Sequence, residues 1–217
     1  MSTIVIVDAG NGLGLSVARV FGHKGFNVAM VARNGQRLDE PVARLTAEGV
    51  PAAGFAADVL DPDAIRTAFE QITDRFGEVE VLKYSVVPRR TAPDEAPVGA
   101  ADVTMEALLP HLDLCLGGAL TVIRQVLPGM IERDNGTLIF TTGLSSLHPV
   151  PGMALAGIAA AGLRSWAHSL HADLVGTGVH VAHIALGTSA TTPDIDVVAP
   201  LYWDVYTNRD QVELLLA

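Results

Sequence analysis

The sequence contains only one cysteine, Cys115, among 217 residues. A disulfide framework within the chain is therefore excluded, and such sparse use of cysteine is typical of proteins from a reducing compartment. Basic residues are also scarce, since 14 Lys and Arg stand against 24 Asp and Glu, which gives a formal net charge of -10. Nucleic-acid binding needs clustered Lys and Arg to contact phosphates, so this composition argues against a nucleic-acid partner.

Long hydrophobic runs are missing as well. The nearest candidate for a membrane span, Leu112 to Leu127, is interrupted by Asp113 and Arg124, whereas a spanning helix needs about 20 mostly apolar residues. Met1 leads within two residues into a strand-like apolar segment, so we expect no cleaved secretory leader. These features predict a soluble cytoplasmic protein without a membrane partner.

The chain does contain enough apolar residues for a sizeable core. Hydrophobic residues make up 49% and charged residues 18%, which is typical of a globular protein, and the length suits one domain over residues 1–217. Short apolar segments alternate with longer helical patterns, which predicts a parallel sheet with helices on both faces. The seven expected strands are Thr3–Val7, Asn27–Val31, Ala52–Ala57, Val79–Tyr84, Thr137–Thr142, His180–Ala185 and Val212–Leu216.

Helical patterns separate these strands. The expected helices are Leu13–Phe21, Gln36–Glu48, Pro62–Phe76, Pro110–Met130, Gly152–Leu174 and a last one that opens with Pro200–Tyr206. Two segments, Pro88–Gly99 and Leu186–Ala199, are predicted loops that follow strands. They therefore belong to the carboxyl edge of the sheet, where open α/β sheets bind ligands.

A glycine-rich turn lies between the first strand and the first helix. It contains Gly10, Asn11, Gly12, Leu13 and Gly14. Glycines let backbone N–H groups approach a pyrophosphate at a helix N-terminus, where the helix dipole favours negative charge. The turn therefore predicts a dinucleotide-binding site, although such a turn also occurs as a plain strand-to-helix connection.

The order of three motifs resembles the short-chain dehydrogenase/reductase family over essentially the whole chain. These motifs are the glycine turn, Ala57-Asp58-Val59 after the third strand, and Leu127-Pro128-Gly129-Met130 before the fifth. The resemblance implies a single Rossmann-type, doubly wound α/β domain with a seven-stranded parallel sheet. It also implies that Asp58, with Val59 beside it, contacts the adenine ring of a cofactor; the alternative for Asp58 is a loop cap.

Arg33 follows the second strand, where NAD-selective relatives place an acid that holds the ribose hydroxyls. Here that place holds Ala32. A guanidinium suits a 2′-phosphate, so NADP(H) is favoured over NAD(H), with a solvated surface arginine as the alternative reading. Relative to the family pattern, Val7 replaces a Thr and Asp8 replaces the first Gly. A carboxylate near a pyrophosphate is unfavourable, so we expect cofactor binding to be weakened or lost.

The resemblance also exposes a missing catalytic set. The family uses a Tyr as general acid, a Lys four residues later that lowers its pKa, a Ser that binds the carbonyl, and an Asn that holds a relay water. These positions map here to Ala156, Ala160, Gly143 and Cys115. Between Met130 and His180 the sequence contains neither Tyr nor Lys, so an error of alignment does not explain the loss. The family's usual carbonyl reduction is therefore predicted to be absent.

Several polar residues remain near these positions. Tyr84, at the end of the fourth strand, is the best substitute acid, with core packing as its alternative. Ser145 and His148 follow the fifth strand and are further candidates for catalysis, although Ser145 also suits a loop cap and His148 a solvated surface group. No metal site is predicted, because His168 and His171 show no obvious third ligand.

Two further features concern ligands and assembly. The aromatic segment Tyr202 to Tyr206 suggests a pocket wall for an apolar or planar ligand, or else core packing. The helices Pro110–Met130 and Gly152–Leu174 look too apolar for one exposed face, and in the family they form a dimer interface. We therefore expect a homodimer, or a homotetramer built from it.

Three functions stay open on this basis. The first is a repurposed enzyme of non-redox chemistry, such as a cyclase, isomerase or dehydratase of secondary metabolism that acts on a small apolar or planar metabolite. The second is an NADP(H)-dependent oxidoreductase with a non-standard proton donor. The third is a non-catalytic ligand-binding protein or partner subunit.

Overall fold

The computed structural model describes residues 1–7, 12–86, 98–187 and 194–216. Seven parallel strands form one sheet in the order β3-β2-β1-β4-β5-β6-β7. The strands are β1 Thr3–Val7, β2 Asn27–Ala32, β3 Ala52–Ala56, β4 Val79–Tyr84, β5 Gly136–Gly143, β6 Val179–Leu186 and β7 Glu213–Leu216. This is the predicted doubly wound sheet. Its order reverses between β1 and β4, the point where such sheets open a ligand crevice.

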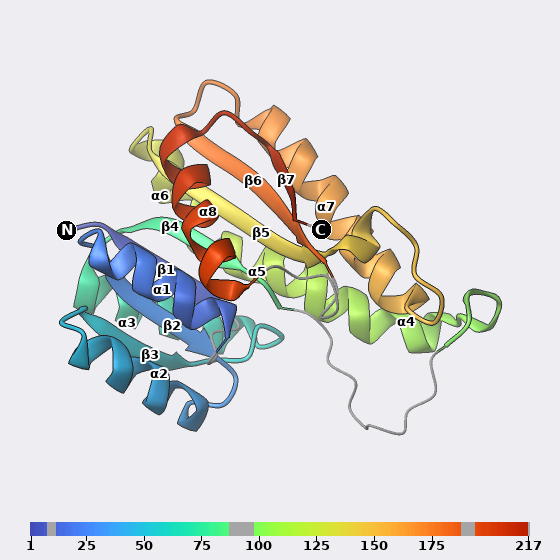
Figure 1. The fold of residues 1–217 in the computed structure, drawn as a ribbon, viewed down its shortest axis with the longest axis horizontal. Helices are drawn as coiled ribbons and strands as arrows, with labels where there is room; N and C mark the ends of the chain where they lie inside the picture. The colour runs from blue at the N-terminus through green and yellow to red at the C-terminus, as the bar shows by residue number, and fades with distance from the viewer. Residues whose placement is uncertain (8–11, 87–97, 188–193, 217) are drawn as a thin grey trace.

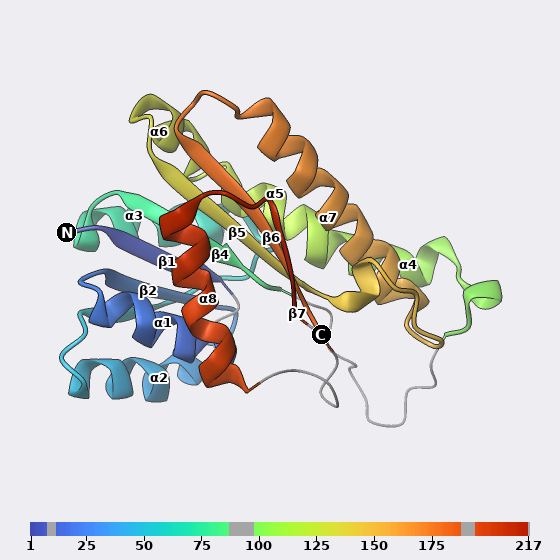
Figure 2. The same ribbon diagram turned by 45° about the horizontal axis from the view of Figure 1, so that its top comes forward.

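Helices cover both faces of the sheet (Figures 1 and 2). The helices are α1 Leu13–His23, α2 Gln36–Ala47, α3 Pro62–Phe76, α4 Met105–Leu112, α5 Gly118–Ile123, α6 Leu127–Glu132, α7 Ala154–Asp173 and α8 Ile195–Asn208. Short turns of other helix types are η1 Ala100–Asp102, η2 Asp113–Gly117 and η3 Leu144–Ser146. Helices α1, α2 and α8 pack on one face, and α3, α5 and α7 pack on the other.

The strands contribute alternately to two apolar cores. On β1, Val5 and Val7 belong to the core under α3, α5 and α7, whereas Ile4 and Ile6 belong to the core under α1, α2 and α8. All four are at most 1% exposed. Because successive side chains of a strand point to opposite faces, a strand buried on both faces must be apolar throughout. This explains the nearly continuous apolar segments from which the sheet was predicted.

The expected helix Pro110–Met130 is wrong in both its start and its continuity. It begins at Met105, where the Thr104 hydroxyl accepts the backbone N–H of Ala107 at 3.2 Å as an N-cap. A π-helical segment follows, and α5 ends at Ile123 before α6 begins at Leu127. The break has a local cause, because Pro128 has no backbone N–H to donate to the carbonyl four residues earlier and lies in the first turn of the new helix.

The last helix was also placed too late. It begins at Ile195 rather than at Pro200, with the Asp194 carboxylate accepting the backbone N–H of Asp196 at 3.0 Å. Pro200 was predicted to start the helix, but it lies inside α8. The predicted loop Leu186–Ala199 is therefore partly strand and partly helix. Its residues 188–193 lie outside the described residues, as do residues 88–97 of the other predicted loop.

One helical run, Met105–Ile123, is long and apolar enough by length and composition to cross a membrane. The expectation that no run reaches such a length was therefore wrong, because the helix starts earlier than Leu112. Its buried side includes Cys115, Ala119 and Val122, which pack in the core. A single run of this kind is weak evidence for a membrane segment, since core helices have the same composition.

Candidate functional site

The N-terminus of α1 lies at the carboxyl end of β1. Gly12 is its N-cap, and the Gly12 carbonyl accepts the backbone N–H groups of Leu15 at 3.0 Å and Ser16 at 3.3 Å. A Cβ atom added at Gly12 would meet only Ile195 Cδ1, at 4.0 Å, among the described atoms. No acidic side chain lies in the first turn of α1. Uncapped N–H groups in an uncrowded first turn fit an anionic group such as a pyrophosphate. Gly10, Asn11 and Asp8 lie outside the described residues.

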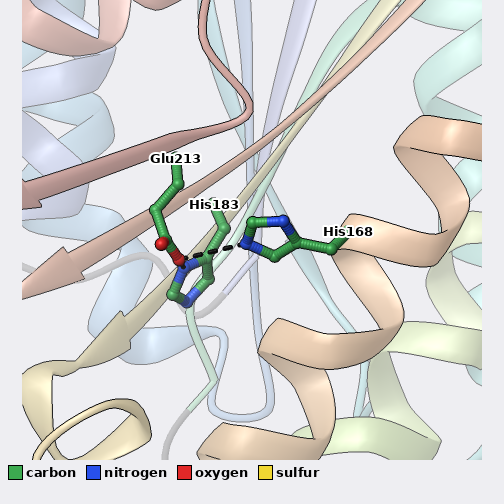
Figure 3. Close-up of side chains that lie close together, drawn as sticks. All are labelled: His168, His183 and Glu213. Carbon is green, nitrogen blue, oxygen red and sulfur yellow. Dashed lines mark hydrogen bonds and ion pairs between the residues drawn. The ribbon is translucent and has the colours of Figure 1, made fainter.

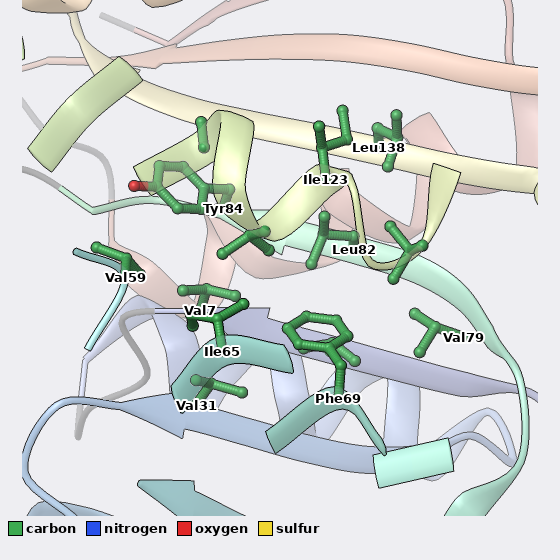
Figure 4. Packing of buried hydrophobic residues seen from close by; sticks show 14 of the residues in the cluster. Val7, Val31, Val59, Ile65, Phe69, Val79, Leu82, Tyr84, Ile123 and Leu138 are labelled. Carbon is green, nitrogen blue, oxygen red and sulfur yellow. The ribbon is translucent and has the colours of Figure 1, made fainter. Parts of the chain in front are cut away.

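Arg33 and Asp58 lie beyond the ends of neighbouring strands, because β2 and β3 pair in parallel with Ala32 beside Ala56. Arg33 is exposed. The Asp58 carboxylate accepts the backbone N–H of Leu60 at 3.0 Å, so the loop cap considered for this residue is present. The side chain of Val59 is buried in the core, as Figure 4 shows.

The four positions that the resemblance maps to the family's catalytic residues lie at the end of β5, on α7 and in η2. Gly143 ends β5, Ala156 and Ala160 lie one turn apart on α7, and Cys115 lies in η2. Burial raises the pKa of the Cys115 thiol to about 11, so this side chain is an inert apolar group at neutral pH. A Cβ atom added at Gly143 would lie 3.5 Å from Ser145 Oγ. A half-buried serine hydroxyl therefore borders the place of the missing serine.

Tyr84 lies in the hydrophobic core. The side chain is 0% exposed, and its hydroxyl donates a hydrogen bond to the carbonyl of Leu114 at 2.6 Å. The ring lies among Val59, Ile123 and other apolar side chains in Figure 4. The end of β4 that carries Tyr84 is covered by η2 and α5, so the Tyr84 hydroxyl does not face an open cleft. This geometry corrects the expectation of an acid in an open cleft and favours the packing alternative.

His148 and the aromatic segment are also placed by the fold. The side chain of His148 is exposed, which agrees with its alternative reading as a surface group. Tyr202 is fully buried and its hydroxyl lies 2.8 Å from Thr141 Oγ1. Trp203 and Tyr206 pack against Phe21, at ring-centroid distances of 5.3 and 5.7 Å. The suggested pocket wall is therefore core packing between α8 and α1.

A buried polar network lies on the opposite face of the sheet, under α7. The parallel register places His183 of β6 directly beside Glu213 of β7, and His183 Nδ1 lies 3.0 Å from Glu213 Oε1. His183 Nε2 lies 2.8 Å from Thr142 Oγ1 of β5. Sequence reasoning missed this set, which we call the Glu213 network; it consists of Thr142, Arg164, His168, His183 and Glu213.

Helix α7 supplies the positive charge of the Glu213 network. Arg164 donates to both carboxylate oxygens of Glu213, at 2.6 and 2.8 Å, and His168 Nε2 lies 3.1 Å from Oε1 (Figure 3). The Arg164 guanidinium holds the pKa of Glu213 at about 2, aided by the two histidines. Burial lowers the pKa of His183, although Glu213 opposes this shift. At neutral pH the pair is therefore a carboxylate beside a neutral imidazole.

The Glu213 network also brings together atoms of the metal-ligand type. One atom each of His168, His183 and Glu213 lies within 4.8 Å of the others. From the sequence, His168 and His171 were considered and no metal site was predicted, because Glu213, 45 residues from His168, was not recognised as a neighbour. Arg164, however, already donates to both oxygens of Glu213. Because its positive charge repels a cation at this place, the geometry favours a hydrogen-bonded cluster over a metal centre.

His180 extends a seam of histidines between α7 and β6. Its ring lies 5.9 Å from that of His171, and its Nε2 atom is buried without a hydrogen-bond partner among the described residues. Burial lowers the pKa of His180 to about 4, with the His171 charge adding to the shift. A histidine whose folded pKa lies below its unfolded value destabilises the fold as pH falls from 6.5 toward 4.

We therefore expect the free energy of unfolding to drop by roughly 2 kcal/mol between pH 7 and pH 5 because of His180 alone. The variant His180→Phe keeps a ring but takes up no proton, so its drop over this interval is expected to be smaller by that amount. Urea denaturation at the two pH values measures the difference. The exposed His148→Gln variant is the control, and equal drops in wild type and His180→Phe would contradict the prediction.

Comparisons with known proteins agree with the fold. A family model described as short chain dehydrogenase matches residues 2–199. Sulfoacetaldehyde reductase 2 of Chromohalobacter salexigens is 29% identical, over 88% of this chain and 74% of that protein. Serine 3-dehydrogenase of Rhizobium radiobacter is 30% identical, over 87% of this chain and 72% of that protein. A metagenomic short-chain oxidoreductase, solved in complex with NADP, superposes with a TM-score of 0.83 at 22% identity over 99% of this chain and 96% of that one.

Proposed function

The chain belongs to the short-chain dehydrogenase family, and from this premise we propose that it is an NADP(H)-dependent oxidoreductase that handles the substrate proton without the usual Tyr and Lys. The relatives reported above are named as a reductase and a dehydrogenase of small polar compounds. They support a substrate of that class, a short hydroxy or carbonyl compound. When bound, the cofactor supplies the hydride acceptor or donor.

The observation that carries the proposal is the geometry at the carboxyl edge beside β1. The first turn of α1 carries no acidic side chain, and among the described residues only Ile195 Cδ1, at 4.0 Å, would meet a Cβ atom added at Gly12. These features suit the pyrophosphate of a dinucleotide. Exposed Arg33 is suited to the 2′-phosphate, since a guanidinium binds phosphate through paired hydrogen bonds. Asp58, whose carboxylate already caps its own turn, is assigned to the adenine side.

Calorimetric titration with NADPH and NADH tests this proposal. We expect NADPH to bind more tightly than NADH, and Arg33→Ala to weaken NADPH binding by roughly 10- to 100-fold, the worth of a charge-assisted hydrogen bond. The same substitution is expected to leave NADH binding nearly unchanged, because NADH lacks the 2′-phosphate. Arg37→Ala, four residues further along the chain and also exposed, is the matched control. No binding of either cofactor at millimolar concentration would refute the proposed function.

A second candidate, non-redox chemistry in the same cleft, is favoured by one feature. Small residues occupy the positions that map to the family's Ser, Tyr and Lys: Gly143, Ala156 and Ala160. A cyclase, isomerase or dehydratase would turn over its substrate without consuming cofactor. Turnover that persists in the absence of NADP(H) would support it against the oxidoreductase. The aromatic segment Tyr202 to Tyr206 lies in the core, so it does not support a planar ligand for this candidate.

We also propose that the protein is a soluble, cytoplasmic homodimer or homotetramer. The support is a group of large apolar side chains that stay exposed on α4, α5 and α7 in the single chain. Met105 is 62% exposed, Leu109 47%, Leu120 37% and Ile158 44%. Covering such side chains in a subunit interface removes apolar area from water, which stabilises the assembly. Light scattering at micromolar concentration measures the mass.

A further inference from the structure

The Glu213 network contains a hydroxyl, an imidazole and a carboxylate in line. A carboxylate with a pKa of about 2 is ionised at neutral pH and accepts hydrogen bonds only. His183 must therefore carry its hydrogen on Nδ1, 3.0 Å from Glu213 Oε1. Since the imidazole is neutral, Nε2 has a free lone pair 2.8 Å from Thr142 Oγ1, and the Thr142 hydroxyl donates to it.

The line continues toward the end of β5. Thr142 Oγ1 lies 3.1 Å from Ser146 Oγ, whose hydroxyl also reaches the carbonyl of Gly143 at 2.9 Å. A hydroxyl hydrogen rotates to suit its partners. When the Ser146 hydrogen turns from Gly143 O toward Thr142 Oγ1, a continuous chain of hydrogen bonds runs from Ser146 to His183. Thr142 is 3% and Ser146 7% exposed, so the chain is buried, and Ser146 is its end away from His183.

The position of this chain matches the missing catalytic set. Thr142 and Ser146 lie on either side of Gly143, the residue that maps to the family's substrate-binding Ser. On α7, Arg164 follows Ala160 by four residues, so it lies one turn below the residue that maps to the missing Lys. The chain therefore begins next to the position that maps to the family's substrate-binding Ser and ends at a neutral imidazole oriented by Glu213.

We propose that Ser146, Thr142 and His183 form a proton relay that replaces the missing Tyr and Lys. This inference rests on the proposed function. In alcohol oxidation, the substrate C–H bond would break with loss of a hydride, for which a bound cofactor would be the acceptor, and the substrate O–H bond breaks with loss of a proton. That proton passes to Ser146 Oγ, the Ser146 proton passes to Thr142 Oγ1, and the Thr142 proton passes to His183 Nε2. Carbonyl reduction runs through the same atoms in reverse. Ser146 is the catalytic residue, and Glu213 is a positioning residue.

The charges around His183 suit this task. Glu213 on β7 stabilises the imidazolium that forms, as the carboxylate does in hydrolase triads. Arg164 and His168 on α7 oppose it, and the hydroxyls of Thr142 and Ser146 add no charge. With its pKa below 6.5, His183 is mainly the neutral base at pH 7. Oxidation is therefore expected to lose rate as pH falls through the His183 pKa, whereas reduction gains rate.

The test combines kinetics with a measurement that needs no turnover. NADP⁺-dependent oxidation of L-serine and short 2-hydroxy acids is followed against pH in wild type, Thr142→Val and Thr142→Ser. We expect Thr142→Val to lower kcat about 100-fold, the usual worth of general base catalysis, to remove the acid limb of the profile, and to leave KM nearly unchanged. Thr142→Ser keeps the hydroxyl and is expected to restore kcat and the acid limb of the profile. His171→Gln, a neighbouring seam histidine outside the relay, is the control.

The independent readout is ¹⁵N NMR of the histidine side chains. We expect His183 to be neutral at pH 7 with its hydrogen on Nδ1, and its Nε2 shift to change in Thr142→Val but not in His171→Gln. A hydrogen on Nε2, or an imidazolium at pH 7, would overturn the relay even if no substrate is found. The relay would also be overturned if Thr142→Val and Ser146→Ala left the dependence of kcat on pH unchanged. Absence of cofactor binding would instead refute the proposed function.

Discussion

Three substitutions, Gly143→Ser, Ala156→Tyr and Ala160→Lys, made together in a Thr142→Val background are expected to raise NADPH-dependent carbonyl reduction by roughly two to four orders of magnitude. The background removes the proposed relay, so the installed acid acts alone. General acid catalysis by a positioned, tuned side chain is worth about this much. The installed Tyr and Lys lie four residues apart on α7 and share a face of the helix.

The space available for the three new side chains differs between the positions. A Cβ atom at position 143 meets Ser145 Oγ at 3.5 Å, which is ordinary contact. Position 156 is half-buried, whereas Ala160 is only 6% exposed, so a Lys there must displace neighbours. A control with Ala156→Phe and Ala160→Met matches the added volume without the chemistry. If the catalytic variant folds and binds NADPH but is no faster than this control, the mapping of the missing set is wrong.

Glu213→Gln is expected to lower the free energy of unfolding at pH 7 by about 2–3 kcal/mol. The Glu213 side chain is 17% exposed, and the substitution leaves Arg164 and the buried His183 without a carboxylate. Removing one partner of a buried pair costs about 3–5 kcal/mol, and partial exposure reduces this value. For a chain of this length, the expected loss in thermal midpoint is roughly 5–10 °C.

The pH dependence separates this effect from simple loss of packing. The folded pKa of Glu213, about 2, lies below its usual value of 4.5. Its stabilisation is therefore present above pH 4.5 and is lost as pH falls from 4.5 toward 2. In Glu213→Gln this part of the acid dependence is expected to disappear. The control is Glu48→Gln, which breaks the Arg19–Glu48 ion pair at 2.7 Å, whose side chains are 35% and 31% exposed. For this variant we expect the free energy of unfolding to fall by less than about 1 kcal/mol. Similar losses in both variants would contradict the prediction.

Local patterns predicted most of the architecture. The strand Val79–Tyr84 was predicted at its observed bounds, and the helix after Asp61 begins with a capping carboxylate and Pro62, as expected. These signals depend on near neighbours: alternating burial on a strand, a cap, a proline at the first helical position. The errors at Pro110 and Pro200 have the same origin. Proline marks helix starts on average, but here earlier caps at Thr104 and Asp194 determine where each helix begins.

The sequence by itself determined the doubly wound sheet, the place of the glycine turn, and the loss of Tyr and Lys, because each is visible within a short stretch or a simple count. Only the tertiary structure decided which polar side chains lie together near the positions that map to them. Thr142, His183 and Glu213 meet because β5, β6 and β7 pair in one particular register, and that register results from packing over the whole sheet. The same packing buries the side chain of Tyr84, hydroxyl included, in the core. The chemistry we propose therefore depends on contacts between strands that no local pattern encodes.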